Sequence, residues 1–189
     1  VEACKGHREK PVWEILDDPH AKAVELLKAG EVIGWFRGRM EFGARALGNR
    51  SILADPSQPG IAQRINKLVK FRESWRPISA SLLESAADDY IDRGKLNSHD
   101  EAMALSVKTT AKFREVYPDV VHVDGTARLQ VVRDDNNADF HNLLSQFADA
   151  TGQRLLINTA PNRPGAALVC TPEEAIHALQ CTHLKHPML

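Results

Sequence analysis

The sequence has few cysteines, few aromatic residues and almost no net charge. Its 189 residues include three cysteines at unrelated spacings and 6% aromatic residues, and the formal net charge is −1. An odd number of cysteines argues against a disulfide-stabilised secreted domain, and there is no run of 18 apolar residues that would cross a membrane. A near-neutral chain also lacks the positive charge that attracts nucleic acid or membranes at long range. We therefore expect a cytoplasmic protein without a membrane partner, in which any anion site is local.

The printed chain starts with the polar segment VEACKGHREK and has no initiator methionine. We expect residues 1–18 to be a linker from a missing N-terminal domain. With 43% hydrophobic residues, the chain is long enough to bury one sizeable core. We therefore expect residues 1–189 to form a single globular domain.

Strand-like and helix-like segments are interleaved along the chain. Helical spacing of apolar residues, proline in the first turn and glycine after the last turn predict helices, while short apolar runs predict strands. Several connections are too short to contain a crossover helix, so the pattern predicts an α/β fold with a mixed twisted sheet and helices packed on it. The polar residues 85–101 are expected to form an exposed loop. The predicted helices are residues 19–29, 59–70, 111–117, 137–151 and 171–180, and the predicted strands are residues 31–36, 51–56, 78–83, 102–109, 120–126, 128–133 and 154–158.

The near-neutral chain contains one basic zone, which we define as residues 37–76. It holds nine arginine and lysine residues against three acidic ones, a net charge of +6. Its first part, RGRMEFGARALGNRS, has glycines at positions 38, 43 and 48, which would let backbone amides approach an anion. A helix beginning near Gly43 would point its positive end at the same anion. The alternative, which composition alone favours, is a solvated face whose glycines serve turns.

Four segments, in the same order, resemble the C-terminal domain of the O-carbamoyltransferases that act on nodulation factors and antibiotics. They are EFGARALGNRSILADP (41–56), KFRESWRPISASLLE (70–84), VVHVDGTARLQVV (120–132) and LLINTAPNRPGAALVCTPEEAI (155–176). The resemblance spans nearly the whole chain, and four collinear segments are more than chance similarity produces.

The resemblance implies a YrdC-like domain that binds ATP and carbamoyl phosphate and forms carbamoyl adenylate with release of pyrophosphate. Mg²⁺ would arrive with the nucleotide. In the resembled family, an N-terminal, actin-like metal-binding domain transfers the carbamoyl group to an acceptor hydroxyl. That domain, in the same protein or in a partner chain, is the expected partner. Adenylate formation depends mainly on positioning and on neutralising phosphate charge, which arginine and lysine side chains do well.

Position by position, the resemblance implies two groups of site residues. The basic residues expected to contact carbamoyl phosphate or the nucleotide phosphates are Arg45, Lys70, Arg76 and Arg128. The further binding residues are Asn49, Arg50, Asn158 and Asn162. The amide groups of Asn158 and Asn162 can both donate to and accept from the nucleotide or the carbamoyl group.

Some of these residues also have a structural interpretation. Asn158 suits a strand-end turn, and Arg128 suits an exposed charge on a strand. His122 fits a half-buried, satisfied histidine better than a catalytic one. Asp124 either binds Mg²⁺ through the nucleotide or belongs to an Asp-Gly turn.

No intrinsic metal site is expected. Near the C-terminus several metal-ligating residue types gather, but they lack a companion metal motif. They are His177, Cys181, His183 and His186.

The sequence departs from the resembled family at Ala44, which replaces a proline without removing a functional group, and more seriously in one loop. Ala160, Pro161, Ala166 and Ala167 stand where the family has serine, phenylalanine, glutamate and proline. The loop has therefore lost a hydroxyl and a carboxylate, and the sequence does not determine how this affects activity. The acceptor substrate and the oligomeric state are also undetermined.

The alternative from another functional class is a non-catalytic nucleotide- or RNA-binding module. We expect no aromatic residues interleaved over the basic zone, which counts against single-stranded RNA. Nucleic acid is therefore not the expected partner.

Overall fold

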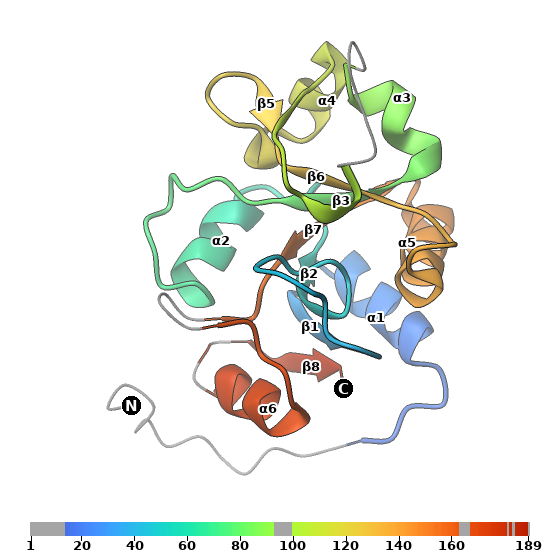
Figure 1. The fold of residues 1–189 in the computed structure, drawn as a ribbon, viewed down its shortest axis with the longest axis vertical. Helices are drawn as coiled ribbons and strands as arrows, with labels where there is room; N and C mark the ends of the chain where they lie inside the picture. The colour runs from blue at the N-terminus through green and yellow to red at the C-terminus, as the bar shows by residue number, and fades with distance from the viewer. Residues whose placement is uncertain (1–13, 93–99, 163–166, 181, 183, 189) are drawn as a thin grey trace.

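The computed structural model describes residues 14–92, 100–162, 167–180, 182 and 184–188. This part of the chain contains a mixed six-stranded sheet with helices on both faces (Figure 1). The strands of the sheet are β1 (Ile33–Phe36), β2 (Arg50–Ala54), β3 (Ala80–Leu83), β6 (Leu129–Val132), β7 (Leu155–Thr159) and β8 (His186–Met188). The α-helices are α1 (Pro19–Lys28), α2 (Ile61–Leu68), α3 (Ala87–Tyr90), α4 (Ala111–Val116), α5 (Ala138–Thr151) and α6 (Pro172–Gln180).

The strand order is β6-β3-β7-β2-β1-β8. The two outer pairs, β3 with β6 and β1 with β8, are parallel, and the three inner pairs are antiparallel. A separate two-stranded ladder joins β4 (Val107–Lys108) to β5 (Thr126–Ala127). The predicted α/β fold with a mixed sheet is therefore confirmed.

Local sequence signals place the helix ends. Asp18 caps α1 by accepting the backbone N–H of Ala21 at 3.0 Å. At α6, Thr171 Oγ1 accepts the N–H of Glu174, and Glu174 Oε2 accepts the N–H of Thr171, which is a capping box. Gly152 ends α5 in the left-handed conformation.

Alternate residues of the strands contribute to two apolar layers. Leu155 and Ile157 of β7 belong to the layer that packs against α2, α3 and α4. Leu156 belongs to the opposite layer, which contains α1 and α5. Figure 1 shows α1 and α5 side by side on one face and α2 on the other. The two layers bury the sheet on both faces and hold its strands rigidly.

The structure differs from the sequence predictions in several segments. The exposed loop expected at residues 85–101 is wrong in its first half, because η2 (Glu84–Ala86) and α3 bury Ala86, Ala87 and Tyr90 in the core. Residues 93–99 lie outside the described part, and η3 (Asp100–Ala102) follows them. The strands expected at 102–109 and 120–126 shrink to β4 and β5, since η4 (Pro118–Val120) and a turn occupy most of the second segment. No strand was predicted at β8, which forms by pairing with β1.

The β1–β2 loop, residues 37–49, is organised by one buried carboxylate. Glu41 is 7% exposed, and its Oε1 accepts the backbone N–H groups of Leu47, Asn49 and Arg50 at 2.7, 2.7 and 2.9 Å. The backbone amides of this loop do surround an anion, and that anion is the protein's own side chain. The helix considered near Gly43 does not form, because positive φ angles at the loop glycines break the chain into turns.

Gly48 lets the β1–β2 loop approach α5 closely. Its φ is +107°, and a Cβ atom at this position would lie 2.2 Å from Cδ1 of Phe140. Phe140 is fully buried in the core, so it has no room to move away. Only glycine fits at this position.

Replacing Gly48 by alanine should destabilise the protein by about 3 kcal/mol or more, because overpacking adds to backbone strain. Gly60→Ala is the matched control: its φ is +70°, and its Cβ would meet no atom within 4 Å. Strain alone predicts a loss of about 1 kcal/mol there. Urea unfolding followed by circular dichroism measures both, and equal losses would contradict the packing argument.

Replacing Glu41 by alanine should reduce the free energy of unfolding by about 3 kcal/mol, because three backbone donors lose a charged acceptor. Glu73→Ala is the control, since Glu73 is exposed and forms a surface ion pair with Arg76 at 2.8 Å. Its loss should stay below about 1 kcal/mol. The same urea titration tests this pair, and the expectation fails if Glu41→Ala costs no more than Glu73→Ala.

Candidate functional site

The sheet brings Arg128 and Asn158 into one row, on either side of Ser79. The N–H of Ala80 donates to the carbonyl of Arg128 at 3.2 Å, and the N–H of Asn158 donates to the carbonyl of Ser79 at 2.9 Å. Residues that share a row across adjacent strands point to the same face of the sheet. Arg128 and Asn158 therefore lie on one face, about 10 Å apart across two strand spacings.

Asn158 belongs to a buried polar network. Its Nδ2 donates to Ser81 Oγ at 2.9 Å and to Gln130 Oε1 at 3.3 Å. Gln130 Nε2 in turn donates to the carbonyl of Leu47, which ties the network to the β1–β2 loop. Asn158 is fully buried, yet its Oδ1 accepts no hydrogen bond from the described residues. A buried acceptor without a partner costs about 1–3 kcal/mol, so this oxygen is a candidate ligand contact.

Arg45 and Arg128 are two cations for which the described residues supply no counter-charge. Desolvation, and then the positive charge of Arg128, lower the pKa of the Arg45 guanidinium. Neither guanidinium donates to, or forms an ion pair with, any residue that the structure describes. Nε of Arg128 is buried and lacks an acceptor within that part of the chain. Two guanidinium groups that influence each other and have no acceptor among the described residues are candidates for binding an anion.

Two predicted binding residues, Arg50 and Asn49, are committed to the protein itself. The guanidinium of Arg50 donates to four carbonyls, including those of Gly38 and Cys170, and stacks on the ring of Phe36 at 3.6 Å. The amide of Asn49 donates to a loop carbonyl and accepts from another side chain. Both side chains hold the β1–β2 loop in place, and their contact with a ligand stays a prediction.

Lys70 and Asn162 are brought together at the end of β7. The ammonium group of Lys70 donates to the carbonyl oxygens of Ala160 and Asn162 and to Asn162 Oδ1, at 2.8 to 2.9 Å. Lys70 is 7% exposed, and burial, then the charge of Arg72, lower its pKa to about 8. The ammonium hydrogens are thus used by the loop that follows β7. A direct contact of Lys70 with phosphate remains a prediction.

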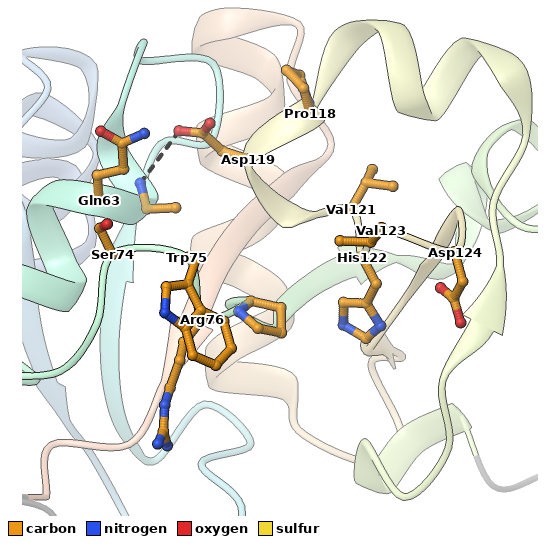
Figure 2. Close-up of a pocket in the computed structure, with 12 residues that line it drawn as sticks. Gln63, Ser74, Trp75, Arg76, Pro118, Asp119, Val121, His122, Val123 and Asp124 are labelled. Atoms are coloured by element: carbon orange, nitrogen blue, oxygen red, sulfur yellow. Dashed lines mark hydrogen bonds between the residues drawn. The ribbon is translucent and has the colours of Figure 1, made fainter.

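Arg76 lies at a cleft of about 530 Å³ (Figure 2). Its guanidinium forms an ion pair with Glu73 at 2.8 Å. One side of the cleft is formed by α2 and residues 74–77, and the other by residues 118–124. Asp119 joins the two sides, because its Oδ2 accepts the N–H of Ala62 in the first turn of α2 at 3.3 Å.

Asp124 takes part in an Asp-Gly turn, as one of its two interpretations predicts. Its Oδ1 accepts both the N–H and the hydroxyl of Thr126, which lowers the pKa of the carboxyl group. Gly125 has a φ of +77°. His122 Nδ1 lies 2.9 Å from the same hydroxyl, and desolvation is the largest cause of its lowered pKa.

The expectation that the basic zone lacks aromatic residues is wrong. Phe42, Phe71 and Trp75 are exposed within it, with exposed fractions of 105%, 48% and 76%. They occupy loops, where no apolar periodicity draws attention to them.

The sequence analysis also missed three residues that build the site: Glu41, Ser81 and Gln130. A signal for two of them was present, because Ser81 and Gln130 interrupt otherwise apolar strands. A polar residue within a buried strand must find a hydrogen-bond partner there.

The described residues contain neither a metal-binding cluster nor a membrane-spanning helix. No group of three histidine, cysteine, aspartate or glutamate residues among them is placed to hold a metal ion. Cys181 and His183, two of the four C-terminal residues considered above, lie outside that part of the chain. None of the described helices is long and apolar enough to cross a membrane.

The fold is similar to two solved structures of HypF. HypF of T. kodakarensis superposes with a TM-score of 0.59 at 15% identity, over 88% of this chain and 20% of that one. Full-length HypF in its phosphate- and nucleotide-bound form superposes with a TM-score of 0.55 at 11% identity, over 90% of this chain and 20% of that one. These similarities support the YrdC-like fold expected from the sequence.

Sequence comparison finds relatives that are much longer than this chain. An uncharacterized protein of Methanocaldococcus jannaschii is 40% identical over 89% of the chain and 27% of its own length. The nodulation protein NolNO of Sinorhizobium fredii is 39% identical over 96% of the chain and 26% of its own length. The 3'-hydroxymethylcephem-O-carbamoyltransferase of Streptomyces clavuligerus is 37% identical over 83% and 29%. The family described as carbamoyltransferase C-terminus matches residues 24–189, and this chain belongs to that family.

Proposed function

We propose that this domain binds ATP and carbamoyl phosphate and forms carbamoyl adenylate. An N-terminal, actin-like domain of the same protein or of a partner chain would then transfer the carbamoyl group to an acceptor hydroxyl. The chain spans about a quarter to a third of the length of the relatives described above, so the complete transfer needs more than this domain. The acceptor belongs to the part of the reaction that lies outside the chain.

The observation that carries the proposal is the pair of cations Arg45 and Arg128, which have no acceptor within the described part of the chain. Like charges are costly to keep together unless an anion neutralises them. Arg128 comes from the edge of the sheet and Arg45 from the β1–β2 loop, so an anion between them would be held from two directions. Phosphate is the anion that such planar donors bind best, through two parallel hydrogen bonds. We place the phosphate group of carbamoyl phosphate here.

Asn158 supplies a complementary contact for the carbamoyl end. The carbamoyl group carries an NH₂ donor, and Oδ1 of Asn158 is a buried acceptor without a partner in the described chain. The network of Ser81 and Gln130 fixes the amide so that its oxygen, and not its nitrogen, is free. A donor on the ligand would remove the cost of the unpaired oxygen.

The chemistry requires positioning more than a protein nucleophile. Water takes up the phosphoryl group of carbamoyl phosphate, which releases phosphate and leaves carbamate. A carbamate oxygen then attacks the α-phosphorus of ATP, the bond to the β-phosphate breaks, and pyrophosphate leaves. Arg45 and Arg128 would neutralise the phosphate charge during these steps. Mg²⁺ would accompany the nucleotide; Asp124 Oδ1 already accepts two hydrogen bonds, so it has no assigned part.

We assign Lys70 and Arg50 positioning roles. Lys70 donates hydrogen bonds to backbone carbonyl oxygens of the loop after β7. Backbone carbonyls are present whatever the side chain is. Ala160 and Pro161, which differ from the resembled family, therefore leave these hydrogen bonds of Lys70 intact, although the family's side-chain groups are missing. Ala166 lies outside the described residues. Arg50 joins the β1–β2 loop to the carbonyl of Cys170 and so keeps Arg45 near the sheet.

A non-catalytic nucleotide- or RNA-binding module is the second candidate, and the exposed aromatic residues of the basic zone favour it. Phe42 and Trp75 could stack on unpaired bases while Arg39 and Arg45 contact phosphates. This alternative needs no contact to a carbamoyl group. It leaves the buried oxygen of Asn158 without a role.

The proposed reaction predicts pyrophosphate release that requires both ATP and carbamoyl phosphate. Arg128→Ala and Arg45→Ala should each reduce kcat/KM about 100-fold, because each removes a cation at developing phosphate charge. Arg64→Ala is the control within the same basic zone, since Arg64 is bound to Gly30 and Glu31. It should keep nearly full activity. Because hydrolysis of carbamoyl phosphate also releases phosphate, a phosphate-release assay is run with and without pyrophosphatase, and the difference measures pyrophosphate for all four proteins.

The absence of pyrophosphate release from the wild type, with an actin-like domain supplied, would contradict the proposal. Titration with ATP and with RNA then tests the second candidate. RNA binding that weakens steeply with salt, without nucleotide specificity, would support it.

The low pKa of Lys70 predicts that stability rises with pH. Between pH 8 and 10.5, the unfolded chain keeps a proton on Lys70 that the folded chain has released. The free energy of unfolding should therefore rise by at most about 3 kcal/mol across this window. Lys70→Met should lack this rise, whereas Lys67→Met, which removes an exposed lysine of α2, should retain it. Urea unfolding at several pH values compares the slopes, and identical slopes in Lys70→Met and wild type would refute the assignment.

A further inference from the structure

The protonation pattern around His122 can be derived from hydrogen-bond geometry. Thr126 Oγ1 lies 2.7 Å from Asp124 Oδ1 and 2.9 Å from His122 Nδ1. A hydroxyl group has one hydrogen to donate, and an ionised carboxylate can only accept. The hydrogen of Thr126 therefore goes to Asp124, and the hydroxyl oxygen must accept a hydrogen from His122. Nδ1 of His122 carries a proton.

The other ring nitrogen, Nε2, is then a free acceptor. Partial burial and the charge of Arg128 lower the pKa of His122, although Asp124 raises it, so the ring is neutral near pH 7. A neutral imidazole has one N–H, and here Nδ1 holds it. No hydrogen bond joins Nε2 to any residue that the structure describes. Nε2 therefore offers a lone pair to a ligand.

The surroundings of His122 suit a flat ligand. Figure 2 shows His122 on one side of the cleft, with Trp75 and Arg76 on the other. The indole of Trp75 is 76% exposed, with the Arg76 guanidinium carbon 6.0 Å from its ring centroid, so much of the ring can still contact a flat ligand. Val121 and Val123 add apolar surface beside the histidine. The cleft therefore combines an aromatic face, an apolar wall and one fixed acceptor, with a cation near the rim.

We propose that this cleft holds the adenine of ATP, and that Nε2 of His122 accepts a hydrogen bond from its exocyclic amino group. This inference rests on the proposed function. Adenine carries an NH₂ donor where guanine carries a carbonyl oxygen, so guanine would set an oxygen against the lone pair of Nε2. His122 thereby selects ATP over GTP. Thr126 and Asp124 are positioning residues, because they fix which nitrogen of His122 holds the proton.

The same arrangement makes the selectivity depend on pH. Protonation of His122 turns Nε2 into a donor, which repels the amino group of adenine and suits the carbonyl of guanine. The charged groups around the ring are Asp124 and Arg128, with Arg76 and Asp119 also lining the cleft or its rim. The preference for ATP should therefore fall as the pH drops through the pKa of His122.

The first test is equilibrium binding of ATP and GTP, measured by isothermal titration calorimetry. The wild type should prefer ATP at least about tenfold at pH 7.5, in line with loss of one well-placed hydrogen bond. His122→Phe should bring the ratio close to one and remove its pH dependence. Thr126→Val should lower the ratio in part, since the ring remains but its tautomer is no longer fixed. His177→Phe, an exposed histidine on α6, is the control and should leave the ratio unchanged.

The second test is nuclear magnetic resonance of the ¹⁵N-labelled histidine rings, which reports the tautomer without any nucleotide. His122 should carry its proton on Nδ1 in the wild type and show both tautomers in Thr126→Val. A proton on Nε2 in the wild type would overturn the inference. So would an unchanged ATP to GTP ratio in His122→Phe while pyrophosphate release is intact, in which case the proposed function stands. If the wild type binds neither nucleotide, the proposed function and the adenine contact are both wrong.

Discussion

The carboxylate of Glu41 is the contact on which the site depends most. It accepts three backbone N–H groups of one loop and so folds residues 41–50 around a buried charge. The ordered loop places Arg45 near Arg128, gives Gln130 a carbonyl to bind, and presents carbonyls to Arg50. Without the Glu41 carboxylate, the backbone N–H groups of this loop would have to hydrogen-bond to water. The loop would then no longer hold Arg45 near Arg128.

Most of the basic zone serves the fold. Arg50, Arg64 and Lys70 donate to backbone carbonyls, and Arg76 pairs with a neighbouring glutamate. These basic side chains therefore stabilise loops of the protein itself. Arg45 and Arg128 differ from these residues, because their guanidinium groups influence each other and donate to none of the described residues. The combination of an unpaired cation pair with an unpaired buried amide oxygen matches a small ligand that has an anionic end and an amide end.

Much of the fold followed from short-range patterns. The prolines in the first turns of α1 and α6 and the glycines after α1 and α5 gave helix ends correctly, since these residues act on the backbone within a few positions. The segment after β3 was misjudged, because its acidic residues suggested solvent while Ala86 and Tyr90 pack into the core. β8 had no pattern of its own and exists through its partner strand. Elements of two or three residues depend on tertiary contacts, which override local preference.

The sequence by itself determined the family resemblance, the mixed α/β class and the types of residue available for an anion site. These features are carried by composition and spacing along the chain. Only the tertiary structure decided which of the basic residues are used by the fold. Arg45 and Arg50 have the same charge within one motif, yet Arg50 donates to four carbonyls while Arg45 has no acceptor among the residues that the structure describes. The physical reason is that hydrogen-bond partners come from residues far away in sequence, and only the folded sheet and its loops bring them within reach.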